Sequence, residues 1–238
     1  MMNLKQIITS KIYTEELSVL PLKAKCIINT INPHSYCEAK KDTVFTKALL
    51  ASDVLLPDGL GIVLAAKVLE GSNIKKIAGA DIHQYLLEEA DKKSQKVFYL
   101  GASENTLKLI EARIQKEFIN IKVASFSPPF KPAFSAKDTE EMIVKVNAFQ
   151  PTILFVGMTA PKQEKWVYLN KDKINANTIV SIGAVFDFYA GNSKRAPKWM
   201  IKLGLEWLHR SIGSWRLAKR NLISNPIFLK DLLFEKLI

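Results

Sequence analysis

Short apolar runs rich in β-branched residues alternate along the chain with longer amphipathic stretches of helical periodicity. The runs predict six strands: Cys26–Thr30, Val54–Leu56, Val97–Leu100, Lys122–Ser125, Ile153–Val156 and Thr178–Ile182. The stretches predict helices: Ser35–Ala51, Gly61–Leu69, Ile82–Lys92, Glu104–Phe118, Asp138–Phe149 and Lys162–Asn170. This alternation indicates βαβ units and an α/β fold, with a Rossmann-like, mostly parallel sheet covered by helices on both faces.

The C-terminal part of the chain has a different composition. From Lys194 to Ile238 there are ten Lys or Arg, three Asp or Glu, and three Trp, at positions 199, 207 and 215. A basic, aromatic segment with helical spacing is typical of a surface-binding appendage. We predict an α/β domain over 1–193, a boundary near Gly191–Pro197 and a basic helical appendage over 194–238. The alternative is that Trp199 and Trp207 are core residues packing this segment on the sheet.

Charge and cysteine content restrict the possible binding partners and the cellular compartment. The 238 residues include 34 Lys or Arg and 23 Asp or Glu, a formal net charge of +11. This excess favours an anionic partner: nucleic acid, a phosphate-bearing small molecule or an anionic membrane surface. The isolated Cys26 and Cys37 are too few for a disulfide framework and fit a reducing cytosol. The N-terminus lacks a secretory signal, and no apolar run is long enough for a bilayer span.

The turns after the predicted strands are the places to look for chemistry, because parallel sheets bind ligands outside the carboxyl ends of their strands. Asp58 follows the second strand and precedes Gly59, which allows close backbone approach, so its carboxylate is placed to meet a substrate. The alternative is a turn residue or a helix cap. Thr30 and Asn32 end the first strand and offer groups that hydrogen-bond a sugar. His34, a lone loop histidine, is interpreted as a bystander.

Three later segments follow strands in the same way. In Gly157–Trp166, Lys162 and Gln163 lie at a helix start, where free N–H groups bind anions; the alternative is a plain loop with a solvated lysine. In Gly183–Pro197, Asp187 lies in an apolar run, so we expect it to be buried and paired with Lys194 or Arg195, in a site or as a structural ion pair. The Pro-rich stretch Ser125–Phe134 is interpreted as a surface loop.

Three absences bear on mechanism. The sequence has no Asp-x-Asp, no His and carboxylate cluster at metal-ligand spacing and no GxSxG. If the protein handles a diphosphate, we expect its charge to be neutralised by Arg, Lys and backbone N–H groups instead of a divalent ion. The appendage supplies arginines for this purpose: Arg195, Arg210, Arg216 and Arg220.

Taken in order, the turn segments resemble one family. They read NTINPHSY, LPDGLGIVLAAKVLEG, IAGADI, VFYLGAS, FVGMTAPKQEKW, GAVFDFYAGNSKRAP and LGLEWLHR, from about Cys26 to Arg220. These segments resemble the WecG/TagA/CpsF glycosyltransferases, glycosyltransferase family 26. The resemblance implies transfer of an N-acetylmannosamine-type sugar from a UDP-sugar donor to a lipid-linked diphosphate acceptor, undecaprenyl-diphosphate-linked N-acetylglucosamine. It implies an inverting reaction in teichoic acid or other surface polysaccharide synthesis, with no metal and no cofactor.

The resemblance also implies roles for individual residues. Asp58 matches the proposed general base, Thr30 lines the same pocket, and Gln163 belongs to the substrate pocket. The matched segments add further substrate-binding candidates: Asn32, Gly59, Gly79, Asp81, Gly101, Gly157, Pro161, Lys162, Glu164, Gly183 and Asp187, with the four appendage arginines. The appendage is expected to bind an anionic membrane surface, at the inner face of the bacterial cell membrane, and to complete the active site. Formation of a homo-oligomer is also implied.

Small departures from the family pattern leave the donor sugar open. Lys76 and Lys162 stand where many members have Arg, and Lys is a less specific phosphate ligand. One alternative is therefore the same fold with another UDP-hexose donor, for exopolysaccharide. A nucleic-acid-binding protein is the alternative from another class, prompted by the charge alone; no RNP, KH, zinc or helix-turn-helix signature supports it.

Overall fold

The structure, a computed structural model, describes residues 3–22, 24–193, 196–202 and 206–237, with the backbone alone at positions 198, 202, 207 and 210. Its strands are β1 (Cys26–Ile31), β2 (Val54–Pro57), β3 (Lys96–Gly101), β4 (Lys122–Phe126), β5 (Ile153–Gly157) and β6 (Thr178–Ser181). The first helices are α1 (Leu4–Ser10), α2 (Pro33–Ala39), α3 (Thr43–Leu50), α4 (Leu60–Glu70), α5 (Gly79–Lys92) and α6 (Glu104–Glu117), with a 3-10 turn at Leu17–Val19. The later helices are α7 (Ala136–Phe149), α8 (Lys162–Asn170), α9 (Gly183–Tyr189), α10 (Lys198–Lys202), α11 (Glu206–Ile212) and α12 (Trp215–Leu237), with a 3-10 turn at Lys171–Lys173.

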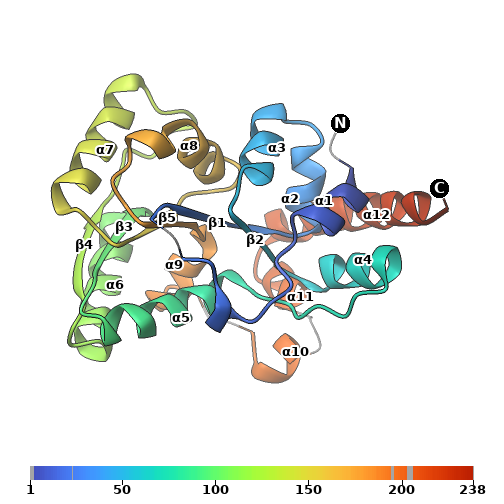
Figure 1. The fold of residues 1–238 in the computed structure, drawn as a ribbon, viewed down its shortest axis with the longest axis horizontal. Coiled ribbons are helices and arrows are strands. Elements are labelled where there is room, and N and C mark those ends of the chain that lie inside the picture. The colour runs from blue at the N-terminus through green and yellow to red at the C-terminus, as the bar shows by residue number, and fades with distance from the viewer. Residues whose placement is uncertain (1–2, 23, 194–195, 203–205, 238) are drawn as a thin grey trace.

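All of these strands are parallel and form one sheet in the order β2-β1-β6-β5-β3-β4 (Figure 1). Each strand begins and ends within one residue of its predicted bounds. Because the strands are parallel, their carboxyl ends meet at one edge of the sheet, and the turns that follow them are brought together there.

Helices cover both faces of the sheet (Figure 1). One face packs against α5, α6 and α9 in an apolar cluster that includes Leu86, Ile110 and Phe186. The other face packs against α7 and α8 in a cluster that includes Val146 and Val167. The predicted fold class, an α/β protein with a parallel sheet and helices on both faces, is confirmed.

The predicted helix Ser35–Ala51 is two helices, α2 and α3. The break lies at Asp42, whose Oδ1 accepts a hydrogen bond from the N–H of Phe45 at 3.0 Å and caps α3. Asp42 also pairs with Lys165 of α8, with Nζ and Oδ2 2.6 Å apart. A short acidic side chain that caps a new helix competes with continuation of the previous one, which explains the break.

The C-terminal helix α12 lies beside α1, α2 and α4 (Figure 1). Phe228 and Leu232 of α12 are buried and share an apolar cluster with Ile31 of β1. Trp199 is 61% exposed, so it is not a core residue, and the side chain of Trp207 lies outside the described residues. No helix in the described ranges has the length and apolar character that a bilayer crossing needs.

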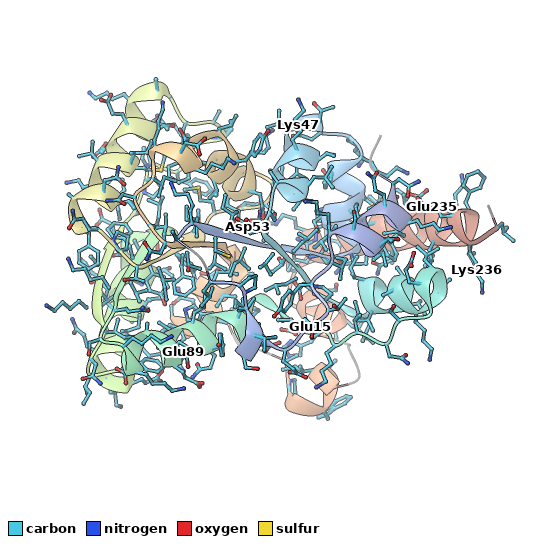
Figure 2. The ribbon with its side chains drawn as sticks, viewed as in Figure 1. Glu15, Lys47, Asp53, Glu89, Glu235 and Lys236 are labelled. Atoms are coloured by element: carbon cyan, nitrogen blue, oxygen red, sulfur yellow. The ribbon has the colours of Figure 1, made fainter. Side chains whose placement is uncertain are left out.

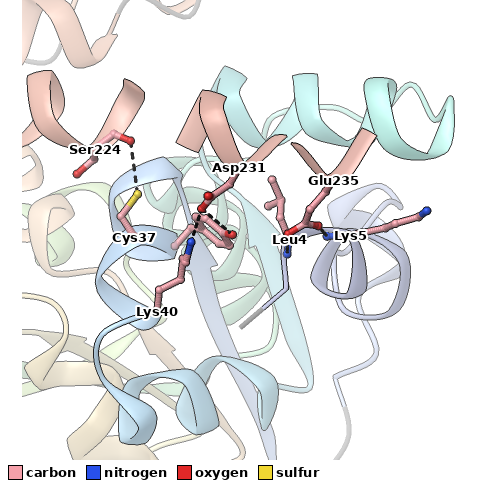
Figure 3. Close-up of polar contacts among 8 residues, drawn as sticks. Leu4, Lys5, Cys37, Lys40, Ser224, Asp231 and Glu235 are labelled. Carbon is pink, nitrogen blue, oxygen red and sulfur yellow. Dashed lines mark hydrogen bonds and ion pairs between the residues drawn. The ribbon is translucent and has the colours of Figure 1, made fainter. Parts of the chain in front are cut away.

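Polar contacts connect α12 to α1 and α2, near the N-terminus (Figure 3). Asp231 Oδ2 accepts a hydrogen bond from the Tyr36 hydroxyl at 3.1 Å and pairs with Lys40 Nζ at 2.6 Å. Glu235, labelled beside α1 in Figure 2, accepts hydrogen bonds from the backbone N–H groups of Leu4 at 2.9 Å and Lys5 at 2.5 Å. The last helix is thus held against α1 and α2 by both apolar and polar contacts.

Candidate active site

A cleft of about 1720 Å³ lies at the carboxyl edge of the sheet. The turns after all six strands contribute to its walls, and so do residues of α11 and α12. Its volume exceeds the roughly 300–1,000 Å³ of a typical small-molecule pocket. The cleft is therefore larger than a single small-molecule ligand needs.

Most of the residues predicted to bind substrate line this one cleft: Thr30, Asn32, Asp58, Gly59, Gly79, Gly101, Gly157, Pro161, Lys162, Gln163, Glu164, Gly183, Asp187, Arg216 and Arg220. Asp81 does not line it; its Oδ2 accepts a hydrogen bond from the N–H of Ala78 at 2.9 Å and caps α5. Arg195 and the side chain of Arg210 lie outside the described residues.

The turn after β2 holds Asp58 at the rim of the sheet. Its backbone N–H donates to the carbonyl of Ile31 at 2.9 Å, which fixes the turn beside the end of β1. Gly59 follows with a φ of +105°, a conformation that strains residues with a side chain. Asp58 itself is half-buried. Its carboxylate is thus carried on a fixed turn next to the segment Thr30–Asn32.

Asn32 has a structural role as well as a place in the cleft. Its Oδ1 accepts a hydrogen bond from the N–H of Ser35 at 3.0 Å, and its own N–H donates to Ser35 Oγ at 2.8 Å. These reciprocal bonds form a capping box at the start of α2. The orientation of the Asn32 amide is therefore set before any ligand binds.

Gln163 joins the turns after β5 and β6. Its Oε1 accepts hydrogen bonds from the backbone N–H groups of Met158 at 3.0 Å and Gly183 at 3.1 Å. Its Nε2 donates to Glu164 Oε1 at 2.8 Å. The side chain is only 5% exposed, and these three bonds fix which end of the amide faces the backbone. Gln163 therefore acts as a clamp between two walls of the cleft.

Glu164 carries a buried carboxyl that lines the cleft. It is 3% exposed, and burial raises the pKa of its carboxyl to about 7, against opposing hydrogen bonds from Gln163 and from its own backbone N–H. A carboxyl with a pKa near neutrality can hold or release a proton under ordinary conditions. Buried groups of this kind occur both in structural networks and in functional sites.

Lys162 organises the loop after β4. Its Nζ donates to the carbonyl of Lys131 at 2.6 Å and lies 3.8 Å from the centre of the Phe134 ring. Burial, with the charge of Lys131, lowers the pKa of Lys162. The loop Ser127–Phe134 therefore forms a wall of the cleft, and the fully exposed Phe130 belongs to it.

Close backbone approach requires glycine where β3 and β5 end. Gly101 has a φ of +124°, and a Cβ placed there would lie 2.2 Å from the carbonyl oxygen of Gly157. That oxygen accepts a hydrogen bond from the N–H of Ala102 at 3.0 Å. A side chain at Gly101 would therefore displace the backbone that forms this part of the cleft.

The expectation that Asp187 is buried is wrong, because its side chain is exposed. The apolar run around it forms the short helix α9, which directs Val185, Phe186 and Tyr189 into the core. With 3.6 residues per turn, position 187 then lies on the opposite side of the helix, toward solvent and the cleft. The predicted pairing partners Lys194 and Arg195 lie outside the described residues.

Cationic side chains line the cleft from several elements. They include Lys76, Lys162, Arg216 and Arg220. Lys76 Nζ lies 3.3 Å from Glu206 Oε2 of α11, so an ion pair links the cleft wall to the C-terminal helices. Among the described residues, no group of three or more His, Cys, Asp or Glu is arranged to hold a metal ion.

Comparison with known families decides the assignment. The family described as "Glycosyl transferase WecG/TagA/CpsF family" matches residues 6–238 of this chain. The chain belongs to the WecG/TagA/CpsF family. It is therefore a glycosyltransferase, and the resemblance drawn from its turn segments is confirmed.

Curated proteins resemble this chain over most of its length. A protein of Bacillus subtilis (strain 168) is 31% identical over 230 residues, which cover 96% of this chain and 87% of that protein. A protein of Staphylococcus aureus (strain MW2) is 28% identical over 202 residues, 85% of this chain and 77% of that protein. Both are named N-acetylglucosaminyldiphosphoundecaprenol N-acetyl-beta-D-mannosaminyltransferase.

Sequence reasoning did not place two parts of this WecG/TagA/CpsF cleft. The sequence predicts only a surface loop at Ser127–Phe134, although its position after a predicted strand is a usable signal for a cleft wall. The sequence predicts no contact for His34, but its Nδ1 lies 2.9 Å from Ser224 Oγ of α12. Burial, followed by the charge of Arg220, lowers the pKa of His34 to about 4, so at neutral pH it is an uncharged link between α2 and α12.

Proposed function

We propose that this chain transfers an N-acetylmannosamine-type sugar from a UDP-sugar to undecaprenyl-diphosphate-linked N-acetylglucosamine, with inversion at the anomeric carbon and without a metal ion or cofactor. The names of its curated relatives support the sugar and the acceptor. The observation that carries the proposal is the single cleft that brings together Asp58, the Gln163 clamp and basic side chains of α12. The excess positive charge, which also prompted the nucleic-acid alternative, then serves diphosphate substrates.

Asp58 is the proposed general base. In one inverting displacement, the acceptor hydroxyl attacks the anomeric carbon from the side opposite the leaving UDP, and its proton must be removed. The half-buried carboxylate on the turn after β2 is the group that we assign to this proton. Positioned general base catalysis contributes about 10²–10⁴-fold. Thr30 is the proposed neighbour in the same pocket.

Stabilisation of the leaving UDP is assigned to fixed positive groups. Negative charge develops on the diphosphate as the glycosidic bond breaks, and preorganised donors and cations stabilise it. Arg216, Arg220 and Lys76 line the cleft and are candidates for this role. Arg195 and Arg210 remain candidates from the sequence alone.

The C-terminal helices are proposed to dock on an anionic membrane surface, at the inner face of the bacterial cell membrane. Several large apolar side chains of this segment are more than half exposed: Trp199, Ile212, Trp215, Leu222, Leu233, Phe234 and Leu237. Tryptophan favours the membrane interface, and each nearby Lys or Arg adds about 1 kcal/mol on an anionic leaflet. Docking would place the cleft beside a lipid-linked acceptor.

The decisive experiment measures UDP release from a panel of UDP-sugars, with and without a short-chain lipid-diphosphate-N-acetylglucosamine, in parallel assays without and with EDTA. Acceptor-dependent release with UDP-N-acetylmannosamine is the expected result. Release only with another UDP-hexose would replace the donor in the proposal. No release with any donor, or release that EDTA abolishes, would overturn the transfer reaction or its metal independence, respectively.

Membrane docking is tested by co-sedimentation with phosphatidylcholine vesicles, with and without phosphatidylglycerol. We expect the wild-type protein to bind only the anionic vesicles and the double variant Ile212→Ser, Trp215→Ser to lose most of that binding. Ile119→Ser is the matched control, because Ile119 is 85% exposed and precedes β4 at the opposite edge of the sheet. Equal binding by the double variant and the control would refute docking through this surface.

A further inference from the structure

Two buried polar atoms of residues that line the cleft have no hydrogen-bond partner within the described part of the chain: Glu164 Oε2 and Ser181 Oγ. Both residues line the cleft, and they are 3% and 0% exposed. Buried polar groups in proteins almost always have a partner. Two unpaired atoms on one wall of a substrate cleft therefore point to a ligand that supplies the missing hydrogen bonds.

The two side chains belong to the same corner of the cleft. Ser181 ends β6 and is paired in register with Val156 of β5, the strand that leads into α8 and Glu164. The Gln163 clamp spans this corner, because it bonds Glu164 Oε1 with its Nε2 and the Gly183 N–H with its Oε1. The register and the clamp together bring Glu164 and Ser181 to one place.

A third buried polar atom, Oδ1 of Asn29, lies beside this corner but not on the cleft. Ile28 and Val180 are paired in register, so the residues that follow them, Asn29 and Ser181, lie side by side on β1 and β6. Asn29 Oδ1 is also without a partner among the described residues, but Asn29 does not line the cleft. A ligand in the cleft therefore meets Glu164 and Ser181 and not Asn29.

The chemistry of this corner selects a neutral polar group. A carboxyl in a buried position disfavours a phosphate, since like charges repel strongly where water is excluded. A hydroxyl group both donates and accepts a hydrogen bond, as the pair of Glu164 and Ser181 requires. The cations that suit a diphosphate, Arg216 and Arg220, come from α12 on another wall of the cleft.

We propose that Glu164 and Ser181 form the subsite that holds a hydroxyl group of the donor sugar. The sugar hydroxyl donates to Glu164 Oε2 and accepts from the Ser181 hydroxyl. This inference rests on the proposed function, because it requires a UDP-sugar donor. It goes further in assigning the sugar, and not the nucleotide or the lipid diphosphate, to a defined corner between β5 and β6.

Calorimetric titration with UDP and with the UDP-sugar that the wild-type protein turns over separates this subsite from the rest of the cleft. In Ser181→Ala and Glu164→Gln, we expect the affinity for UDP to stay within about twofold and that for the UDP-sugar to fall about tenfold. Glu141→Gln, an exposed position on α7, is the matched control. Ser181→Ala alone decides the test if Glu164→Gln does not fold.

Deoxy donors supply the second arm of the test. Removing the recognised hydroxyl from the sugar should weaken binding to the wild-type protein about tenfold and weaken binding to Ser181→Ala by a clearly smaller factor, because one of the hydroxyl's two partners is already absent there. Unchanged UDP-sugar affinity in both variants, or an equal loss for UDP and UDP-sugar, would overturn the subsite. Failure of the proposed function is distinguishable, since it appears as absent turnover in the wild-type protein.

Discussion

Lys76 and Glu206 form an ion pair across the cleft, with Nζ and Oε2 3.3 Å apart, and both side chains are mostly buried at 14% and 17% exposure. Lys76 precedes α5 on the sheet domain, whereas Glu206 begins α11 in the C-terminal segment. The pair thus joins the two parts of the chain at the substrate site. It also neutralises a cation that would otherwise face an anionic ligand.

Breaking this pair from either side should change UDP affinity in opposite directions. Glu206→Gln leaves Lys76 charged and without its anionic partner, so UDP should bind about two- to fivefold more tightly; Lys76→Met removes the charge and should weaken binding by a similar factor. Calorimetric titration with UDP measures both. Lys75→Met is the control, because Lys75 is 79% exposed and pairs with Glu16 away from the cleft. A loss of affinity in both variants would mean that the pair only positions α11.

The proposed base gives the second prediction. Asp58→Asn keeps the shape of the side chain and the turn fixed by the Ile31 carbonyl, so the protein should fold normally. It should lose at least about a hundredfold in kcat, because the amide cannot accept the acceptor's proton. UDP release under saturating substrates measures this, with Asp172→Asn as an exposed control. Turnover near that of the wild-type protein would exclude Asp58 as the base.

The strands and the edge that carries the site were predictable because local pattern determines them. β-branched runs such as Cys26–Thr30 define each strand, and the parallel arrangement then brings Asp58, Gln163 and Gly183 to one edge. The family motifs lie in the turns at that edge. These motifs can be found in the sequence without knowing which distant segments of the chain contact one another.

Contacts between segments distant in sequence were not predictable. The Gln163 clamp depends on the register of β5 and β6, and the His34 contact depends on the docking of α12 against α2. The pattern does not predict that Asp187 is exposed, because a seven-residue helix is too short to show a clear period. In each case the outcome depends on packing, which a pattern along the chain does not contain.

The docking of α12 gives the third prediction. Asp231→Ala removes the acceptor for the Tyr36 hydroxyl and the partner of Lys40 (Figure 3). The free energy of unfolding should fall by about 1–3 kcal/mol, because the partly buried Tyr36 hydroxyl loses its hydrogen bond. Asp231→Asn retains an acceptor and should lose less, and Lys230→Ala is the exposed neighbour as control. Urea unfolding measures all three. An unchanged stability in Asp231→Ala would mean that the other contacts of α12, among them the apolar packing of Phe228 and Leu232, hold the helix without Asp231.

The raised pKa of Glu164 gives the last prediction, on stability against pH. Burial raises this pKa from 4.5 to about 7, so the folded state binds a proton that the unfolded state releases between these values. The contribution to stability is therefore full below about pH 4 and is lost as pH rises toward 7, by about 3 kcal/mol at most. The charged groups around it have partners elsewhere: Lys162 bonds the Lys131 carbonyl, and Lys165 pairs with Asp42.

Glu164→Gln isolates this contribution, because its side chain does not titrate while all other groups remain. From pH 5 to pH 8, the variant should gain stability relative to the wild-type protein, by a difference approaching about 3 kcal/mol. Urea unfolding at several pH values measures the difference in stability between Glu164→Gln and the wild-type protein. His34 and His83 have lowered pKa values in both proteins, so their titration cancels in this difference. Parallel stability curves would show that Glu164 stays ionised in the folded state, which requires a cation or donors close to its carboxylate.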